Sequence, residues 1–211
     1  MVDGVKQNSP GRGQARTRLA RRAVLDAARD LFIEGGYATT TIAAISTRAD
    51  VPEPTLYRLF SSKLGILEVL LDVSIAGDDE PVAVTERPNV ASLFDEPDLR
   101  KVLAGFAAVT TQINERTNDL YAVLTGAAAA DADAAVLLRT LREQRDRGQG
   151  NIVRTLHRKQ CLRSGLKARD AADIVHALMS PEVFRLLVVE RGWTPDRYRK
   201  WVTDMLVQQL T

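Results

Sequence analysis

The most constraining feature of this sequence is a pair of short helical patterns within residues 41–60, which read TIAAISTRADVPEPTLYRLF. Threonines at 39–41 offer an N-cap for a helix over about 42–49. The turn that follows needs a residue with positive φ, and Asp50 tolerates that conformation better than most residues, although less well than glycine. Pro54 keeps the second helix very short. Two short helices joined by a tight turn predict a helix-turn-helix.

A helical period also dominates the rest of the chain, so the expected fold is all-α. Residues 17–34 place apolar side chains on one face, and Gly35-Gly36 ends that helix, because glycine is the usual residue at a left-handed C-cap. A fourth helix is expected over about 62–76. Residues 77–97 carry three prolines and several acids and predict a loop or partly ordered linker. Further helices are expected over about 98–116, 118–130, 133–160, 168–191 and 195–210, with a kink or split at Ser180-Pro181.

Composition excludes several classes of protein. A chain of 211 residues holds one large domain or two small ones. Its 45% hydrophobic and 27% charged residues exclude disorder throughout. No uncharged apolar run reaches the roughly 18 residues of a transmembrane helix, and the polar N-terminus does not resemble a secretory signal. The single cysteine, Cys161, excludes an internal disulfide and suits a reducing compartment, so we expect a cytoplasmic protein.

The sequence shows no motif of an enzyme or a cofactor site. It has no glycine-rich phosphate loop, nucleophile elbow or metal motif. His157 and Cys161 are four residues apart and share a helical face, but two ligands do not make a metal site. His176 lies in an apolar segment and is expected to be a core or interface histidine, while Asp131 and Asp133 are expected to cap a helix. We therefore expect no catalytic residue, no metal and no cofactor.

Positive charge is concentrated at the N-terminus. Residues 1–70 contain ten Lys/Arg and seven Asp/Glu, whereas the remainder contains nineteen against twenty. Within the first 22 residues, six basic residues face Asp3 alone. A basic N-terminus on a neutral body indicates contact with a polyanion, although a solubilising disordered tail over 1–15 explains the charge equally well.

Residues 36–63 carry a set of positions with a characteristic order and spacing: Gly36-Tyr37, Thr40-Thr41, Ile45, Ala49, Val51, Thr55-Leu56-Tyr57, Phe60 and Lys63. In these positions the chain resembles the TetR family of transcriptional regulators, over roughly residues 16–71. The resemblance implies a helix-turn-helix DNA-binding domain over 16–76. Helix 4 would join it to a helical effector-binding and dimerisation domain over 77–211.

Three residues depart from the family pattern. The family usually has glycine where Asp50 stands and a capping serine where Pro52 stands, and proline has no side-chain acceptor for capping. We therefore expect Glu53 to be the N-cap and Pro54 the first residue of a recognition helix over about 54–60. Glu53 also replaces a residue that is often basic. It either accepts a hydrogen bond from a cytosine amino group or is a solvated cap without a base contact.

The side chains at the start of the recognition helix are expected to read base edges. Pro54, Thr55 and Arg58 are the candidates: Thr55 suits a thymine methyl group and Arg58 suits a guanine. Leu56, Leu59 and Phe60 are expected to pack inward. Four further residues resemble the family's contacts to the DNA backbone, which position the protein without reading sequence. They are Thr41, Arg48, Tyr57 and Lys63.

The helical body is expected to form a homodimer and to bind a small effector, since helix-turn-helix proteins read paired half-sites. Two apolar faces predict the dimer interface, and burial inside one subunit is the alternative. These faces comprise Ile174, Leu178, Phe184, Leu187, Val188, Tyr198, Trp201 and Met205. A mixture of apolar and hydroxyl side chains predicts the effector pocket, with ordinary core as the alternative. Its candidate residues are Phe106, Thr110, Ile113, Tyr121, Leu124, Thr125, Leu137 and Leu141.

These observations predict a sequence-specific DNA-binding transcriptional regulator, in this family most often a repressor released from its operator by a small apolar effector. Its expected partners are double-stranded operator DNA, a second copy of the chain and an unidentified effector, with no membrane. The alternative is a helical architectural or interaction protein that binds nucleic acid without an effector. A regulator should prefer its operator over random DNA by ~10³ or more, which separates the two.

Overall fold

The structure is a computed structural model that describes residues 11–77 and 83–211. Every regular element in these residues is a helix, which confirms the all-α prediction. The chain divides into two compact units, Met1–Leu70 and Leu71–Thr211. Helix α4 (Lys63–Ala76) is continuous across this division, whereas the sequence places the domain limit at the end of that helix.

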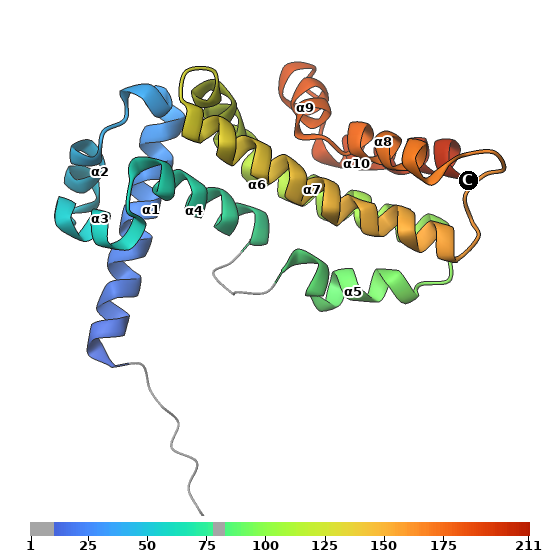
Figure 1. Cartoon of the computed structure of the whole chain (residues 1–211), viewed down its shortest axis with the longest axis horizontal. Coiled ribbons are helices and arrows are strands. Elements are labelled where there is room, and N and C mark those ends of the chain that lie inside the picture. Colours follow the sequence, from blue (N-terminus) through green and yellow to red (C-terminus); the bar gives the residue numbers. More distant parts are fainter. Residues whose placement is uncertain (1–10, 78–82) are drawn as a thin grey trace, which may run out of the picture. The chain divides into compact units, whose positions relative to one another are not determined.

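The N-terminal unit is built from α1 (Arg12–Thr39), α2 (Ile42–Ala49), α3 (Glu53–Phe60) and the first turns of α4 (Figure 1). Gly36 interrupts α1 with φ 81° and ψ 172°, as the sequence predicts. Because α1 begins at Arg12, the last residues of the predicted disordered tail 1–15 are helical, and residues 1–10 lie outside the described residues. The core of this unit contains Val24, Ala28, Phe32, Ile45 and Leu56.

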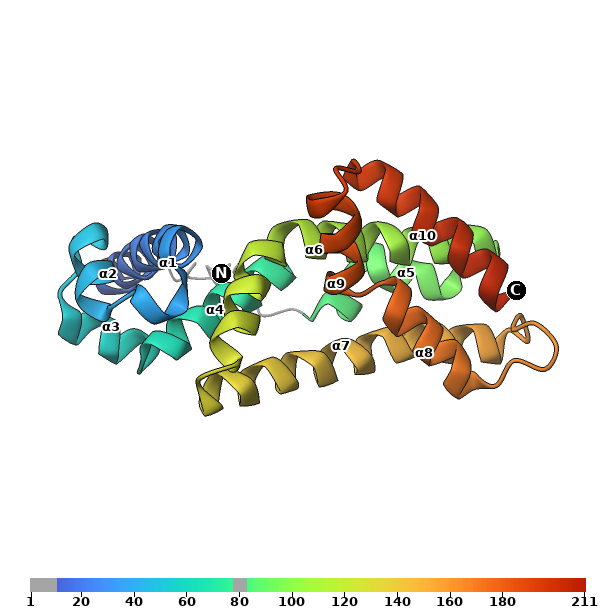
Figure 2. The ribbon, with the colours of Figure 1, turned by 90° about the horizontal axis from the view of Figure 1, so that it is seen from above.

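The second unit contains the helices from α5 to α10 (Figure 2). Helix α10 packs along α6, and α8 packs along α7. Its core joins apolar residues of α6, α7, α8 and α10, with Tyr198 fully buried at its centre. The elements are a 3₁₀ turn η1 (Val84–Glu86), α5 (Pro88–Asp95), α6 (Leu99–Ala128), α7 (Ala132–Arg158), α8 (Ala168–Leu178), α9 (Pro181–Phe184), a π-helix η2 (Arg185–Glu190) and α10 (Pro195–Leu210).

Two of the predicted helix boundaries in this unit are wrong. The predicted break at Asn118-Asp119 is absent, because Thr117, Leu120 and Leu124 are buried and hold α6 as one helix through the polar pair. The predicted loop over 77–97 contains η1 and α5, since Pro88 starts α5 and Val90 is buried in the core.

Two predicted helix caps in this unit, at Ser180 and Asp131, are confirmed. The Ser180 hydroxyl accepts a hydrogen bond from the Val183 N–H at 3.1 Å, and Pro181 begins α9. The 168–191 segment is therefore split at the predicted position. Asp131 caps α7 by accepting from the Asp133 and Ala134 N–H groups, each at 3.0 Å. Asp133 is a residue of the first turn of α7 rather than a cap.

Candidate nucleic-acid interface and effector region

The turn between α2 and α3 is held by local hydrogen bonds. Thr41 caps α2, because its hydroxyl accepts from the Ala44 N–H at 3.1 Å. Asp50 has φ 51° and ψ 43°, so it supplies the left-handed residue that the turn requires. The Ser46 hydroxyl then donates to the Val51 carbonyl at 2.7 Å. These contacts fix the start of α3 relative to α2.

The start of the recognition helix corrects one prediction. Pro52 is the N-cap, Glu53 is the first helical residue and Pro54 lies within the first turn. The Pro52 carbonyl accepts from the Thr55 N–H at 2.8 Å and from the Leu56 N–H at 3.3 Å. The predicted cap at Glu53 is wrong because this carbonyl begins the helix without a side-chain acceptor. Glu53 instead places its carboxylate in the first turn, where the helix dipole favours negative charge.

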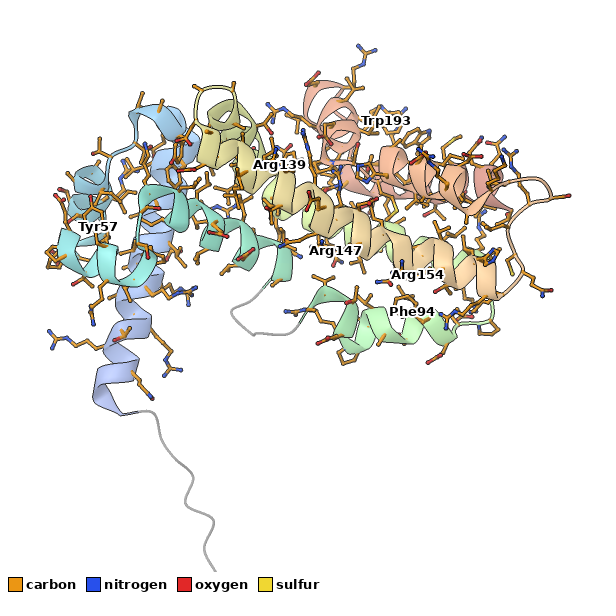
Figure 3. The ribbon with its side chains drawn as sticks, in the orientation of Figure 1. Tyr57, Phe94, Arg139, Arg147, Arg154 and Trp193 are labelled. Atoms are coloured by element: carbon orange, nitrogen blue, oxygen red, sulfur yellow. The ribbon has the colours of Figure 1, made fainter. Side chains whose placement is uncertain are left out.

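Helix α3 has one buried and one exposed face. Leu56 and Phe60 are buried, Leu59 is half-buried and Tyr57 is 51% exposed. Figure 3 labels Tyr57 on α3. The exposed face therefore offers polar and charged groups to a ligand on an apolar support. Of the residues predicted to contact bases, Glu53, Pro54 and Arg58 are exposed, and Thr55 is half-buried.

Three of the residues predicted to contact the DNA backbone, Thr41, Arg48 and Lys63, engage protein groups in this structure. Arg48 Nη1 donates to both carboxylate oxygens of Glu34, at 3.0 and 3.1 Å. Both side chains are largely exposed, so this ion pair is weak and can exchange for a phosphate. The Thr41 hydroxyl is exposed and accepts the capping hydrogen bond, which leaves its proton available as a donor.

Lys63 has a structural contact that sequence reasoning missed. Its ammonium donates to the Tyr37 carbonyl at 2.7 Å and to the Thr40 carbonyl at 2.9 Å. It also lies 4.1 Å from the centre of the Tyr37 ring. Lys63 thus ties the first residue of α4 to the junction of α1 and α2. The shared pattern of Gly36-Tyr37 and Phe-x-x-Lys was the signal in the sequence.

The other end of α4 is held by Arg116 of α6. Arg116 Nε donates to the Ser74 carbonyl at 2.8 Å, and Arg116 Nη2 donates to the Ile75 carbonyl at 3.1 Å. Carbonyl groups in the last turn of a helix have no partner within the helix, so a cation is well placed there. Gly77 follows with φ 87° and ends α4.

The candidate effector residues are mostly part of the packed interior. Two surface hollows, of about 490 and 670 Å³, lie elsewhere in the second unit, and none of the candidate residues lines either one. The larger hollow is lined by residues of α6 and of the start of α10. Among the candidates, Phe106, Leu124, Leu137 and Leu141 are buried, Thr110, Ile113 and Tyr121 are half-buried, and Thr125 is exposed.

Two of the candidate dimer residues pack inside one chain. Phe184 and Tyr198 form an edge-to-face pair with ring centres 5.1 Å apart, and the Tyr198 hydroxyl donates to the Leu178 carbonyl at 3.1 Å. For these two rings the alternative of burial within the subunit holds. The π-helix η2 exposes Leu186 and Val189, each at 48%, which sequence reasoning missed because it assumed an α-helical period. The remaining candidates, Ile174, Leu178, Leu187, Val188, Trp201 and Met205, are half-buried.

A network of charged and polar side chains joins α7, α8 and α9. Arg145 Nη1 lies 3.4 Å from a Glu182 oxygen, and Arg142 Nη2 lies 3.6 Å from the other. Arg145 Nη2 is 2.8 Å from His176 Nε2. Burial and the Arg145 charge lower the pKa of His176. Burial opposes ionisation of Glu182, but its own main-chain N–H and Arg145 lower its pKa overall. His176 is part-buried and packs beside Arg145, which agrees with the expected core or interface position.

The described residues contain no group of three or more His, Cys, Asp and Glu side chains arranged to hold a metal ion. Among the same residues, no helix is both long and apolar enough to cross a membrane.

The capped turn, the exposed face of α3 and the basic first helix define a helix-turn-helix DNA-binding protein. Residues 24–70 match the model of the bacterial regulatory proteins of the tetR family. Two relatives in Bacillus subtilis are described as uncharacterized HTH-type transcriptional regulators. YvkB is 41% identical over 54 residues, covering 26% of this chain and 29% of YvkB. YdeS is 26% identical over 181 residues, covering 84% of this chain and 83% of YdeS.

Solved structures share the fold of nearly the whole chain. A putative TetR-family regulator from Syntrophomonas wolfei has a TM-score of 0.69 at 20% identity, covering 90% of this chain and 93% of its own. NalD from Pseudomonas aeruginosa, the secondary repressor of a multidrug efflux pump, has a TM-score of 0.69 at 19% identity, covering 92% of this chain and 98% of NalD. FadR from Bacillus subtilis, in complex with stearoyl-CoA, has a TM-score of 0.69 at 17% identity, covering 90% of this chain and 99% of FadR.

These findings agree with one another: residues 24–70 match the tetR family of bacterial regulatory proteins, and nearly the whole chain has the fold of TetR-family regulators. Its relatives are regulators rather than enzymes, as the sequence predicts.

Proposed function

We propose that this regulator is a repressor that binds a two-fold symmetric operator as a homodimer and leaves it when a small effector binds the helical unit. The observation that supports release is the attachment of α4 at both ends. Lys63 binds carbonyl groups at the junction of α1 and α2, and Arg116 of α6 binds carbonyl groups in the last turn of α4. A change in α6 therefore has a direct route to the helix that leads into the DNA-binding unit.

We assign sequence reading to the exposed side of α3. Arg58 pairs with a guanine, Thr55 contacts a thymine methyl group, and Pro54 packs against the same base edges. Glu53 either accepts from a cytosine amino group or stays solvated. Tyr57 and the three other predicted backbone contacts, Thr41, Arg48 and Lys63, position the protein on phosphates, and the basic residues before Ala20 add further phosphate contacts.

Dimerisation places two copies of α3 about one DNA turn apart, ~34–36 Å, or a multiple of it. The exposed Leu186 and Val189 of η2, together with the six half-buried candidates on α8, η2 and α10, supply the apolar surface for this contact. Phe184 and Tyr198 support that surface from within the subunit. As a bacterial regulator that binds operator DNA, the protein acts in the cytoplasm.

The effector acts by binding the DNA-incompetent conformation more tightly than the competent one. A coupling of ~1–3 kcal/mol weakens operator binding roughly 5- to 150-fold, and operator DNA weakens effector binding by the same factor. Two solved neighbours were crystallised with ligands: FadR with stearoyl-CoA, and a putative regulator from Saccharomonospora viridis with choline. We expect a ligand with substantial apolar surface, since the interior of the helical unit is predominantly apolar.

The decisive experiment is selection of binding sites from random DNA, followed by affinity measurements on the selected site and on random sequence. A regulator should favour its site by ~10³ or more. In transcription from a promoter that carries the site, the purified protein should lower transcript yield. A specificity ratio near one would favour the architectural protein instead, and increased transcription would identify an activator.

A further inference from the structure

The smaller surface hollow of the helical unit, of about 490 Å³, lies where three helices meet. Phe94 of α5 and Ala168, the first residue of α8, line it together with residues of the C-terminal part of α7. Phe94 packs edge-to-face on the buried ring of Phe106, with ring centres 5.5 Å apart, and Val153 of α7 is itself buried. The wall of the hollow is therefore predominantly apolar and is supported by the core. Its volume falls within the ~300–1,000 Å³ of small-molecule sites.

Two arginines line this hollow without a carboxylate partner. Arg154 and Arg158 are four residues apart on α7, so they share one face of the helix. The Arg154 guanidinium donates to the side-chain oxygen of Asn151, and the Arg158 guanidinium donates to the Thr155 hydroxyl at 3.4 Å. Both acceptors are neutral. Neither arginine forms an ion pair with a carboxylate of the described residues, and the lining of the hollow contains no Asp or Glu.

The positive charge extends along the chain beyond these two arginines. From Arg154 to Arg169 the sequence contains six Lys/Arg and no Asp/Glu. Five of these six side chains are exposed, and the half-buried Lys159 donates to the Glu96 carbonyl. The end of α7 carries about half a negative charge from the helix dipole, which is too little to balance six cations. A concentration of one sign of charge attracts ligands of the opposite sign.

The larger hollow of the helical unit, of about 670 Å³, does not share this imbalance. Its lining includes Glu115 and Asp196, and Arg199 pairs with Asp196 at 3.0 Å. Of these two hollows, only the smaller one combines apolar surface with positive charge that no carboxylate in its lining offsets.

We propose that the hollow beside Phe94 and Val153 binds an amphiphilic organic anion. Its apolar body packs on these two side chains, and its carboxylate or phosphate binds Arg154 and Arg158. A guanidinium binds either head group through two parallel hydrogen bonds, so each arginine exchanges a neutral acceptor on its own helix for a charged one. Figure 3 shows Phe94 and Arg154, which approach this hollow from α5 and α7. The inference rests on the proposed function in treating this anion as the effector.

The test compares ligands that share a linear alkyl chain and differ in head group, with calorimetry on the full-length protein. Octanoate and octyl phosphate carry the two anionic head groups, octanamide is neutral, and inorganic phosphate has no chain. At least one of the two anions should bind roughly tenfold more tightly than octanamide, because hydrogen bonds between ions are stronger than neutral ones. Octyl phosphate should bind more tightly than inorganic phosphate, because its chain buries apolar surface.

Substitutions at exposed positions locate the site. Arg154→Gln and Arg158→Gln should each weaken the anion roughly fivefold or more and leave octanamide unchanged. Arg139→Gln and Arg147→Gln are matched controls, because both arginines are exposed on α7, outside the hollow and without an ion pair among the described residues (Figure 3). Ala168→Trp fills the hollow from its exposed rim. It should weaken anion and amide alike and keep the melting temperature of the free protein.

The inference is wrong if neither anion binds, if anions and amide bind equally, or if inorganic phosphate binds as tightly as octyl phosphate. It is also wrong if Arg154→Gln and Arg158→Gln have no larger effect than the two controls, an outcome that identifies a solvated basic surface. Operator affinity with and without the anion tests the proposed function separately. Specific operator binding without anion binding refutes only this inference. Anion binding in the hollow without a change in operator affinity upholds the site and contradicts effector release through it.

Discussion

The Arg116 contact with α4 yields a prediction whose size follows from the structure. Arg116→Met keeps most of the apolar stem and removes two hydrogen bonds from a guanidinium, to the Ser74 and Ile75 carbonyls at 2.8 and 3.1 Å. Hydrogen bonds of charged groups contribute ~1.5–3 kcal/mol each, but solvent can partly replace them at this half-buried site. We therefore expect a loss of about 2 kcal/mol in the free energy of unfolding, or roughly 4–8 °C in melting temperature for a chain of this size.

Urea denaturation and calorimetry measure this loss. The matched control is Arg100→Met, also on α6, because Arg100 pairs with Asp204 at 2.5 Å through side chains that are each 62% exposed. Such an exposed pair contributes only ~0–1 kcal/mol. Arg116→Met should also reduce the effect of a bound effector on operator affinity, whereas the control should not. If the two variants lose equal stability and both keep full release, Arg116 does not connect α6 to α4.

Three further predictions address DNA contact and pH. Tyr57→Phe should weaken binding to operator and to random DNA alike. Arg58→Ala should cost ~1–3 kcal/mol of operator binding and relax the preference at one base pair per half-site. Site selection with both variants would show whether the two roles are swapped. Deleting residues 1–18 should lower the salt dependence of binding by roughly 0.9 in log–log slope per lost phosphate contact, and an unchanged slope would show that this segment does not touch DNA. Because burial and Arg145 lower the pKa of His176, the unfolded chain takes up a proton at a higher pH than the folded chain. The free energy of unfolding should therefore fall as the pH drops below about 6.5, and urea titrations of His176→Gln should lack this part of the slope.

The DNA-binding unit could be predicted closely because its signals are local. Thr41 as a cap, Asp50 in the left-handed region and Gly36 as a helix break each act within a few residues of themselves. The start of α3 could not be predicted, because the Pro52 carbonyl accepts the first hydrogen bonds of the helix, where a side-chain cap at Glu53 was expected. Every residue type has a main-chain carbonyl, so no residue in the sequence marks this position.

In the helical unit, tertiary contacts override local signals. The polar pair at 118–119 predicts a break, but burial of its neighbours holds α6 together. The exposed side of η2 depends on a π-helical period that the sequence does not reveal. The network of Arg142, Arg145, His176 and Glu182 joins three helices, and no local pattern in the sequence indicates such contacts.

The contact with α4 and the interior of the helical unit meet in one turn of α6. Asn114 and Arg116 are two residues apart, so they project roughly 200° apart around the helix axis and about 3 Å apart along it. Asn114 is buried beside the Tyr198 hydroxyl, and the Arg116 guanidinium binds the last turn of α4. In the proposed mechanism, an effector that shifts this part of α6 also moves the Arg116 guanidinium. The carbonyls of Ser74 and Ile75 then either follow that guanidinium or lose its hydrogen bonds, so the shift reaches α4 through a single turn of α6.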